Sequence, residues 1–262
     1  MKKKFEFITY YTNILTCIIN KIYKPTKLGR PRKYTNEIYI KHIINFIIDG
    51  CSWNKLKRTI TYVDSVRKIF KKWCDDLIFY YAYIVVNKQY NKKNKNITNY
   101  YIDSTSIQNK FMKTNLMSYG YKYKNKLSIK LDVICDDNYF IHYIGLSKGS
   151  QHDSKSLDYI IPKFNKQIKN QNYINLIGDK GYIKDNKTKL EYKNNYKVNL
   201  LTPTKINSKN NNNLEEIELL KNRNKIENCF NAIKNGYSLI NFPSGNEKNY
   251  LGYIYITISL YN

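Results

Sequence analysis

The order of its apolar segments is the feature that most constrains how this chain can fold. Between residues 97 and 234, runs with the two-residue alternation of strands are interleaved with segments of helical periodicity. The order is three strands, helix, strand, helix, strand and helix, at 97–102, 127–133, 140–144, 153–169, 173–177, 187–193, 196–201 and 215–234. An antiparallel hairpin set followed by strand–helix–strand units predicts a ribonuclease-H-like α/β fold, with a mixed five-stranded sheet and flanking helices.

The residues before this region favour helices alone. Helical periodicity extends over 1–24 and 37–48, Ser52 can cap a short helix, and Asp64 can cap a longer one. A short helix, a tight turn and a second helix form the helix-turn-helix pattern. We therefore expect a small all-helical, helix-turn-helix-like domain to precede the α/β domain.

Two breaks in the pattern suggest how the chain is divided. The segment 87–96 is polar and basic without periodicity, which is typical of a linker, and an asparagine-rich break lies at 207–213. The first break predicts a helical DNA-binding domain over 1–90 and a ribonuclease-H-like catalytic domain over 97–262.

The charge of the chain favours a polyanionic partner. Lysine and arginine total 45 against 20 aspartates and glutamates, which gives a formal net charge of +25. Such a surplus suits phosphate backbones or anionic membranes. Base bias is an alternative source of part of the charge, because Lys, Asn, Ile and Tyr, whose codons are rich in A and T, are all common here.

Two basic segments favour DNA as this partner. The first is a turn near residue 30, whose Gly-Arg-Pro sequence resembles the core of an AT-hook, in which arginine enters a narrow A·T minor groove. The second is the side of the helix capped by Asp64 that lies opposite its apolar face, for which a solvated basic surface is the alternative. The residues expected to contact DNA are Arg30, Arg32, Arg67, Lys68 and Lys71.

Cysteine and histidine usage excludes other classes of protein. The five cysteines form no CxxC pair and the three histidines are scattered, so neither a disulfide framework nor a zinc site is predicted. The sequence has no recognisable signal peptide and no apolar stretch long enough to span a bilayer. We expect an intracellular, reducing setting, with the DNA and without a membrane.

Three carboxylates stand where a metal-dependent site needs them. Asp103 and Asp179 each close a short apolar run predicted as a strand, and Glu227 lies on the predicted helix over 215–234. In the expected fold the first and fourth strands are neighbours at the centre of the sheet, and the last helix packs across both. Carboxylates in these places can meet and hold Mg²⁺. Each alone is explained as an ordinary turn or surface residue, but the three together favour a metal site.

Two basic residues accompany Glu227 on its predicted helix. At about 100° per residue, Arg223 and Lys234 point to the same side of the helix as Glu227, beside its apolar stripe. If this edge borders a cleft, Arg223 and Lys234 can contact phosphates next to the metal. The alternative is a surface ridge with an ion pair between Arg223 and Glu227, four residues apart.

These motifs resemble those of a DDE-type insertion-sequence transposase, in the group built around insertion sequences four and five. The third carboxylate of that family lies in a Y-x2-R-x3-E-x6-K signature, and this chain has the arginine, glutamate and lysine at those spacings but Leu220 in place of the tyrosine. The segments 103–105 and 178–182 are similar to the family's two aspartate motifs, and 152–154 matches a recurring element before a helix. The likeness covers about residues 28–260.

The resemblance implies a DNA transposase with two Mg²⁺ ions, for which Mn²⁺ can substitute, held by Asp103, Asp179 and Glu227. Water would cut the ends of a mobile element, and the freed 3′-hydroxyl ends would join to target DNA. A homodimer is expected, since two ends have to be brought together. Two alternatives stay open: a ribonuclease-H-like nuclease or resolvase that cuts without joining, and a non-catalytic DNA-binding relative.

Overall fold

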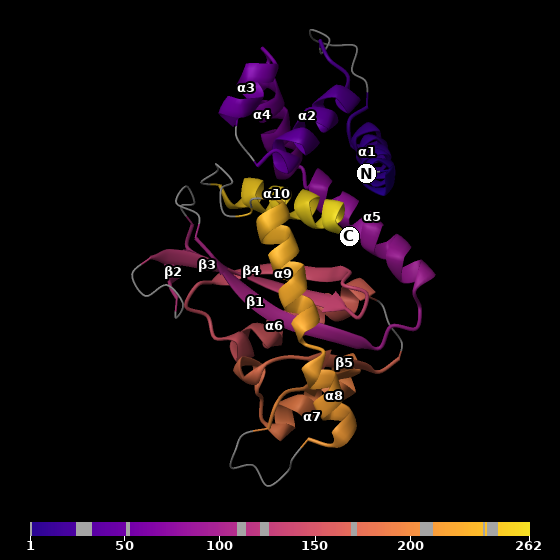
Figure 1. Cartoon of the computed structure of the whole chain (residues 1–262), viewed down its shortest axis with the longest axis vertical. Helices are drawn as coiled ribbons and strands as arrows, with labels where there is room; N and C mark the ends of the chain where they lie inside the picture. Colours follow the sequence, from indigo (N-terminus) through magenta and orange to yellow (C-terminus); the bar gives the residue numbers. More distant parts are fainter. Residues whose placement is uncertain are drawn as a thin grey trace. The chain divides into compact units, whose positions relative to one another are not determined.

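The structure, a computed structural model, describes residues 2–24, 33–50, 53–108, 114–120, 126–168, 172–204, 212–237, 239 and 246–262. These residues form two compact units. A helical unit contains chiefly residues of Met1–Gln89 and Ala232–Asn262, and a second unit, which contains the sheet, is formed by residues of Tyr90–Gln108 and Asn115–Asn231 (Figure 1). No helix among the described residues is both long and apolar enough to cross a membrane.

The helical unit packs through aromatic side chains. The ring of Trp53 stacks on Phe46 with centroids 3.8 Å apart, and Trp73 is fully buried. The predicted short helix and its longer successor are both present and are joined by a three-residue turn, which confirms the helix-turn-helix pattern of elements. The first four helices are α1 (Lys2–Ile22), α2 (Asn36–Ile48), α3 (Trp53–Thr59) and α4 (Val63–Asp75).

The C-terminal helix α10 (Glu247–Tyr261) packs on α4 within the same unit. The two helices approach closely at Gly252, where an added Cβ would lie 2.4 Å from the Sγ of Cys74. Most of the apolar segment 251–260 is buried here. By its contacts the segment Ala232–Asn262 thus belongs to the helical unit, although it follows the sheet in the sequence.

Helix α5 (Ile78–Lys93) overturns the linker predicted at 87–96, because most of that segment is helical. Its end is fixed by Tyr90, whose ring stacks on Phe140 with centroids 3.6 Å apart and whose hydroxyl donates to Asp136 at 2.8 Å. Lysine and glutamine also favour helices intrinsically, so a polar sequence without an apolar stripe can continue a helix when tertiary contacts hold it.

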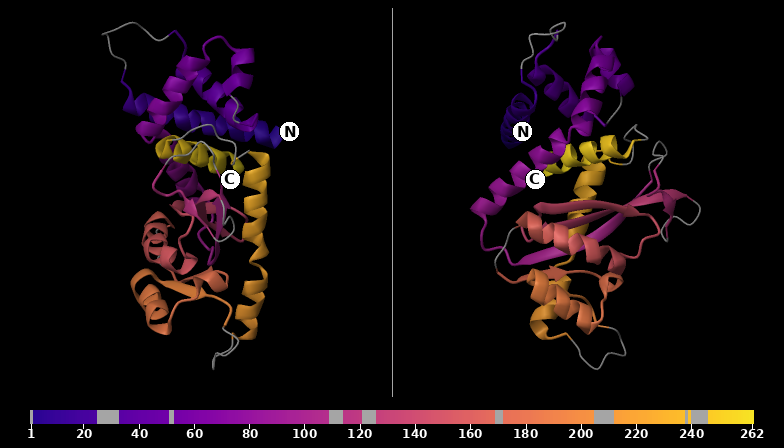
Figure 2. Two further views of the ribbon diagram at one scale, coloured as in Figure 1. Left: turned by 90° about the vertical axis from the view of Figure 1, so that its left-hand side faces the viewer. Right: turned by 180° about the vertical axis from the view of Figure 1, so that it is seen from behind.

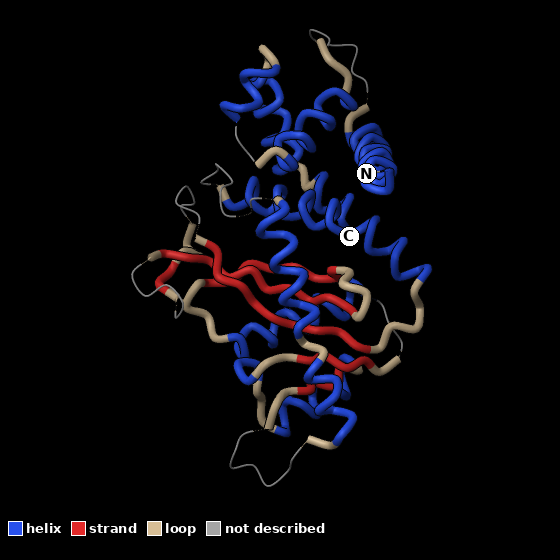
Figure 3. Tube along the Cα trace, in the orientation of Figure 1, coloured by secondary structure: helices blue, strands red, loops and turns tan. Residues whose placement is uncertain are grey.

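The sheet has the predicted order, and its class is confirmed as a mixed, ribonuclease-H-like sheet with flanking helices (Figure 3). The central strand β1 is antiparallel to β3 and parallel to β5, and the order across the sheet is β4-β3-β1-β5-β6. The described sheet has six strands instead of the predicted five. The additional strand, β2, has two residues that pair with the start of β3, and it is too short to show a period in the sequence. The strands are β1 (Asn99–Ile107), β2 (Ser118–Tyr119), β3 (Leu127–Asp136), β4 (Ile141–Lys148), β5 (Ile174–Ile177) and β6 (Val198–Leu201).

Helices cover both faces of this sheet (Figure 2). On one face lie α6 (Asp153–Ile168) and α7 (Asn186–Tyr196), whose apolar side chains share a buried core with Ile102 and Leu176. On the other face lies α9 (Asn224–Gly236), which buries Ile226. Because side chains alternate along a strand, β1 presents neighbouring residues to these two different layers.

The single helix predicted over 215–234 is divided into α8 (Leu214–Lys221) and α9. Asn213 and Glu216 form a capping box at the start of α8, and the helix ends at Asn222. Arg223 follows in the turn before α9, where its side chain bonds both to Asp103 of the sheet and to Glu227 of α9. The contact with Asp103 is tertiary, so the helical periodicity of the sequence could not reveal the break.

Candidate functional site

Asp103 lies within β1, the central strand, on the face that α9 covers. Its cross-strand neighbour in β3 is Val133. Its side chain is 20% exposed, its Oδ1 accepts a hydrogen bond from the backbone N–H of Ser104 at 2.7 Å, and its Oδ2 accepts from Arg223 at 3.2 Å. The carboxylate is therefore held from one side by its own strand and from the other by the turn that precedes α9.

Arg223 joins Asp103 to Glu227. One guanidinium nitrogen, Nη1, donates to Asp103, and the other, Nη2, donates to Oε1 of Glu227 at 3.0 Å. Glu227 lies in the first turn of α9 and is half exposed. Two of the three predicted acids are thus connected through one planar cation, and the ion pair between residues 223 and 227 considered above is present.

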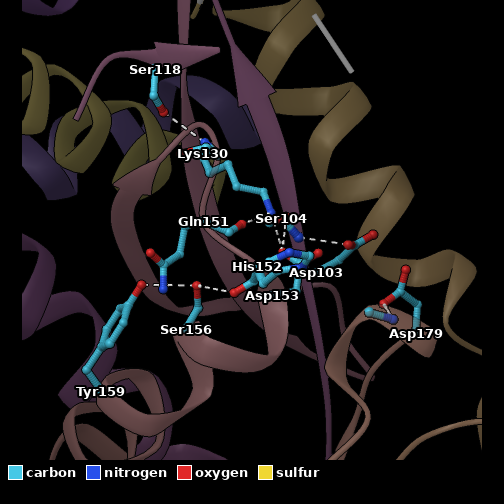
Figure 4. A network of polar contacts seen from close by, with 12 residues as sticks. Asp103, Ser104, Ser118, Lys130, Gln151, His152, Asp153, Ser156, Tyr159 and Asp179 are labelled. Carbon is cyan, nitrogen blue, oxygen red and sulfur yellow. Dashed lines mark hydrogen bonds and ion pairs between the residues drawn. The ribbon is translucent and has the colours of Figure 1, made fainter. Parts of the chain in front are cut away.

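Asp179 reaches the same region from the end of β5. The parallel register pairs Tyr101 with Ile177, and Asp103 and Asp179 each follow these residues by two positions. The carboxylate of Asp179 caps the short 3-10 helix η1 (Lys180–Tyr182) and accepts from the backbone N–H of Gly181 at 2.7 Å. Figure 4 shows both aspartate side chains on the same side of β1.

The surroundings of Asp103 disfavour the ionised form of its carboxyl group when no further cation is near. Burial raises the pKa of Asp103 to about 6, and the nearby charge of Asp179 adds to the increase. The N–H of Ser104 and the guanidinium of Arg223 act in the opposite direction. A partly buried acid beside a second acid attracts a cation, which is the electrostatic requirement of a metal site.

In this structure the side chains of the three predicted acids do not form a complete metal-coordination site. Among the described residues, no three acidic, histidine or cysteine side chains are grouped closely enough to hold one metal ion. Arg223 lies between Asp103 and Glu227, so its single positive charge is shared by the two acids. The sharing of one ion by the three acids stays a prediction.

The remaining predicted site residues are all basic, and two of them lie outside the described residues. Lys234 is on α9, seven residues after Glu227. Arg67, Lys68 and Lys71 are all exposed on α4, opposite a buried face. Arg30 and Arg32 lie outside the described residues.

A polar network that the sequence analysis missed lies on the opposite face of β1. Asp153 accepts from Ser104 at 2.8 Å and from Lys130 at 2.6 Å (Figure 4). Asp132 is cross-strand to Ser104 and only 1% exposed. The alternation of polar and apolar residues over 127–133 did signal a polar face, but that pattern normally indicates solvent and here the face is buried.

Comparisons with known proteins give a matching family and a similar solved structure. Residues 102–262 match the sequence profile of a family described as DDE superfamily endonuclease. A cryo-electron microscopy structure of the piggyBac transposase, in a synaptic complex with hairpin DNA, is similar with a TM-score of 0.50 and 12% identity. That similarity covers 97% of this chain and 70% of the other, and at such identity it concerns the fold alone. No curated protein matches the sequence.

The burial of Asp132 predicts a pH-dependent cost to stability. Burial raises its pKa from 3.8 to about 6, with a nearby Ser147 hydroxyl opposing the rise. Its stabilising contribution is therefore complete below pH 3.8 and is lost as the pH rises through 6. Relative to Asp132→Asn, the free energy of unfolding of the natural protein should fall by about 2 kcal/mol between pH 4 and 7, measured by denaturant titration.

Asp158→Asn provides the control, because the pH dependence of stability that Asp158 contributes has the opposite sign and occurs at lower pH. Although burial opposes it, the hydrogen bond from Lys184 lowers the pKa of Asp158, so its contribution is lost only as the pH falls below 3.8. A difference between the natural protein and Asp132→Asn that stays constant from pH 4 to 7 would contradict the assignment.

Proposed function

Because the chain belongs to the family of DDE superfamily endonucleases, we propose that it is a DNA transposase that cuts the ends of a mobile element and joins the freed 3′-hydroxyl ends to target DNA. One observation carries the proposal. The parallel register of β1 and β5 sets Asp103 level with Asp179, and Arg223 links Asp103 to Glu227. Three acids that lie far apart in the sequence therefore belong to one region of the sheet unit.

We propose that Asp103, Asp179 and Glu227 hold two divalent cations, Mg²⁺ or Mn²⁺. The residues fit hard cations, because carboxylate oxygens are their preferred ligands and the buried Asp103 already draws a guanidinium to its side. When bound, the ions supply an activated water and neutralise charge on the leaving oxygen. The carboxylates would have to turn toward one another, since no three of the described side chains are grouped for metal binding as they stand.

Arg223 is proposed to change partners when DNA binds. Its guanidinium now pairs with two carboxylates, and the same planar fork suits two oxygens of one phosphate. Cations between Asp103 and Glu227 would release Arg223 toward the DNA backbone. Lys234, farther along α9, is proposed to contact the backbone as a second positive charge.

The DNA itself is proposed to be held by the exposed basic side of α4 as well. Arg67, Lys68 and Lys71 project from a helix whose opposite face is buried, so their charges are available to phosphates. The fold is shared with a piggyBac transposase described as a synaptic complex with hairpin DNA, which supports DNA as the partner. We propose that a homodimer brings two element ends together, inside the cell where that DNA lies.

Removal of any one of the three acids should abolish strand cleavage while DNA binding persists. For Asp103→Asn, Asp179→Asn and Glu227→Gln we expect the rate to fall by a factor of about a thousand, equivalent to about 4 kcal/mol of transition-state stabilisation. The assay is Mg²⁺-dependent cleavage of DNA that carries the sequences on either side of the gene, where the proposed function expects the element ends. Glu191→Gln, an exposed acid on α7, serves as the control with an unchanged rate.

The same assay separates transposition from the alternatives. With paired ends and a target plasmid, joined product is expected. Cut ends without joined product would indicate a nuclease or resolvase, and cleavage that is unaffected in all three variants would refute the proposed site.

Binding through α4 predicts a change in salt dependence. The triple variant Arg67→Ala, Lys68→Ala and Lys71→Ala should lose up to three phosphate contacts. The slope of log K against log salt should then fall by about 0.9 for each lost contact. Fluorescence anisotropy with a labelled duplex measures it. A triple alanine variant of Lys163, Lys166 and Lys187, exposed in the sheet unit, removes the same charge as a control. Equal slopes for the two variants would contradict the assignment.

A further inference from the structure

Asp153, the first residue of α6, ties together the two strands beside Asp103. Its Oδ1 accepts from the hydroxyl of Ser104 at 2.8 Å and from Nζ of Lys130 at 2.6 Å. Ser104 directly follows Asp103 in β1, and Lys130 lies in β3, where it is cross-strand to Ser106 of β1. One carboxylate oxygen of Asp153 therefore links β1 to β3 through these two bonds, and on β1 the linked residue directly follows Asp103.

The second oxygen of Asp153 faces the turn that carries Asp179. An added Cβ at Gly181 would lie 3.0 Å from Oδ2 of Asp153 and 2.9 Å from Oδ1 of Asp179. The N–H of Gly181 already donates to that same Oδ1 at 2.7 Å. The backbone of η1 thus lies close to both carboxylates, and an added side chain at Gly181 would require both carboxylates to shift.

These contacts hold Asp153 in one geometry. Its side chain is 24% exposed and that of Lys130 is 11% exposed, so the ion pair is largely shielded from water. Lys130 also donates to the backbone oxygen of Gln151 at 2.9 Å, which fixes the lysine from the loop before α6. A partly buried pair with satisfied hydrogen bonds positions its neighbours more firmly than an exposed pair does.

We propose that Asp153 is a positioning residue that sets the separation of Asp103 and Asp179, and so determines the affinity of their site for divalent cations. This inference rests on the proposed function. Asp153 acts from the far side of β1, through Ser104 on the strand and Gly181 on the turn, and does not itself contact the metal (Figure 4). Outer residues that orient metal ligands typically change metal affinity or activity by about 10- to 100-fold when they are replaced.

Two variants of the full-length protein test the inference independently. Asp153→Asn keeps the shape of the side chain but weakens its bonds to Ser104 and Lys130. Gly181→Ala, at an exposed position, forces the carboxylates of Asp153 and Asp179 to shift and leaves the core untouched. Asp158→Asn is the matched control, since Asp158 is on the same helix and pairs with a lysine, Lys184, at 2.8 Å.

The measurement is the dissociation constant for Mn²⁺, obtained without DNA from the electron paramagnetic resonance signal of the free ion. Asp153→Asn and Gly181→Ala should bind Mn²⁺ about tenfold more weakly than the natural protein and need correspondingly more Mg²⁺ for half-maximal cleavage. The DNA affinity measured in the presence of a metal chelator should be unchanged, and so should the melting temperature of Gly181→Ala. Asp158→Asn should bind Mn²⁺ and DNA as tightly as the natural protein does.

Two outcomes would overturn the inference and are distinguishable. If Asp103→Asn abolishes Mn²⁺ binding but Asp153→Asn and Gly181→Ala bind as tightly as the natural protein, Asp153 is only a structural ion-pair partner. If Asp103→Asn also leaves Mn²⁺ binding unchanged, the metal site of the proposed function is itself refuted. Should Asp153→Asn fail to fold, Ser104→Ala, which removes the hydroxyl that donates to Asp153, takes its place, with the same tenfold weaker Mn²⁺ binding expected and unchanged binding overturning the inference.

Discussion

The parallel pairing of β1 with β5 is the constraint on which the rest of the candidate site depends. It places Tyr101 opposite Ile177, so that Asp103 and Asp179, two residues further along, reach the same level of neighbouring strands. Side chains alternate along a strand, and a slip of one residue in β1 would turn Asp103 toward the α6 layer. The hydrophobic core between sheet and helices fixes this register, because Ile102 has to remain in that layer.

This pairing has an electrostatic cost that the chain offsets from both faces of the sheet. Asp103 is partly buried next to another acid, and the resulting rise in its pKa reflects a charge that lacks compensation. Arg223 supplies a positive charge on the α9 side, and Lys130 supplies one to Asp153 on the α6 side. In a chain of net charge +25, the proposed metal ligands are a local concentration of negative charge.

Much of the fold could be predicted from the sequence, because periodicity reports local structure. The order of strands and helices from β1 to β6 was predicted, apart from the two-residue strand β2. What failed depended on contacts between distant segments. The end of α5 is held by the stacking of Tyr90 on Phe140, and the break before α9 accompanies the bond from Arg223 to Asp103. The periodicity of the sequence does not reveal such contacts between distant segments.

The candidate site, like the fold, could be predicted in part from the sequence, and the rest depends on tertiary contacts. Residue types and spacing selected Asp103, Asp179 and Glu227, and the structure brings the elements that carry them to one region. The network around Asp153 was hidden, because polar residues on a strand normally indicate a face open to solvent, and Asp132 is buried instead. A burial of this kind becomes visible only when the helix that covers the strand is known.

Anomalous diffraction from a crystal grown with Mn²⁺ would show whether the three acids share divalent cations. We expect an anomalous peak with oxygens of Asp103, Asp179 and Glu227 around it, at about 2.0–2.3 Å for those that bind directly. In the same map Arg223 should have left the two carboxylates. Peaks located elsewhere, with Arg223 still bridging Asp103 and Glu227 at saturating Mn²⁺, would contradict it.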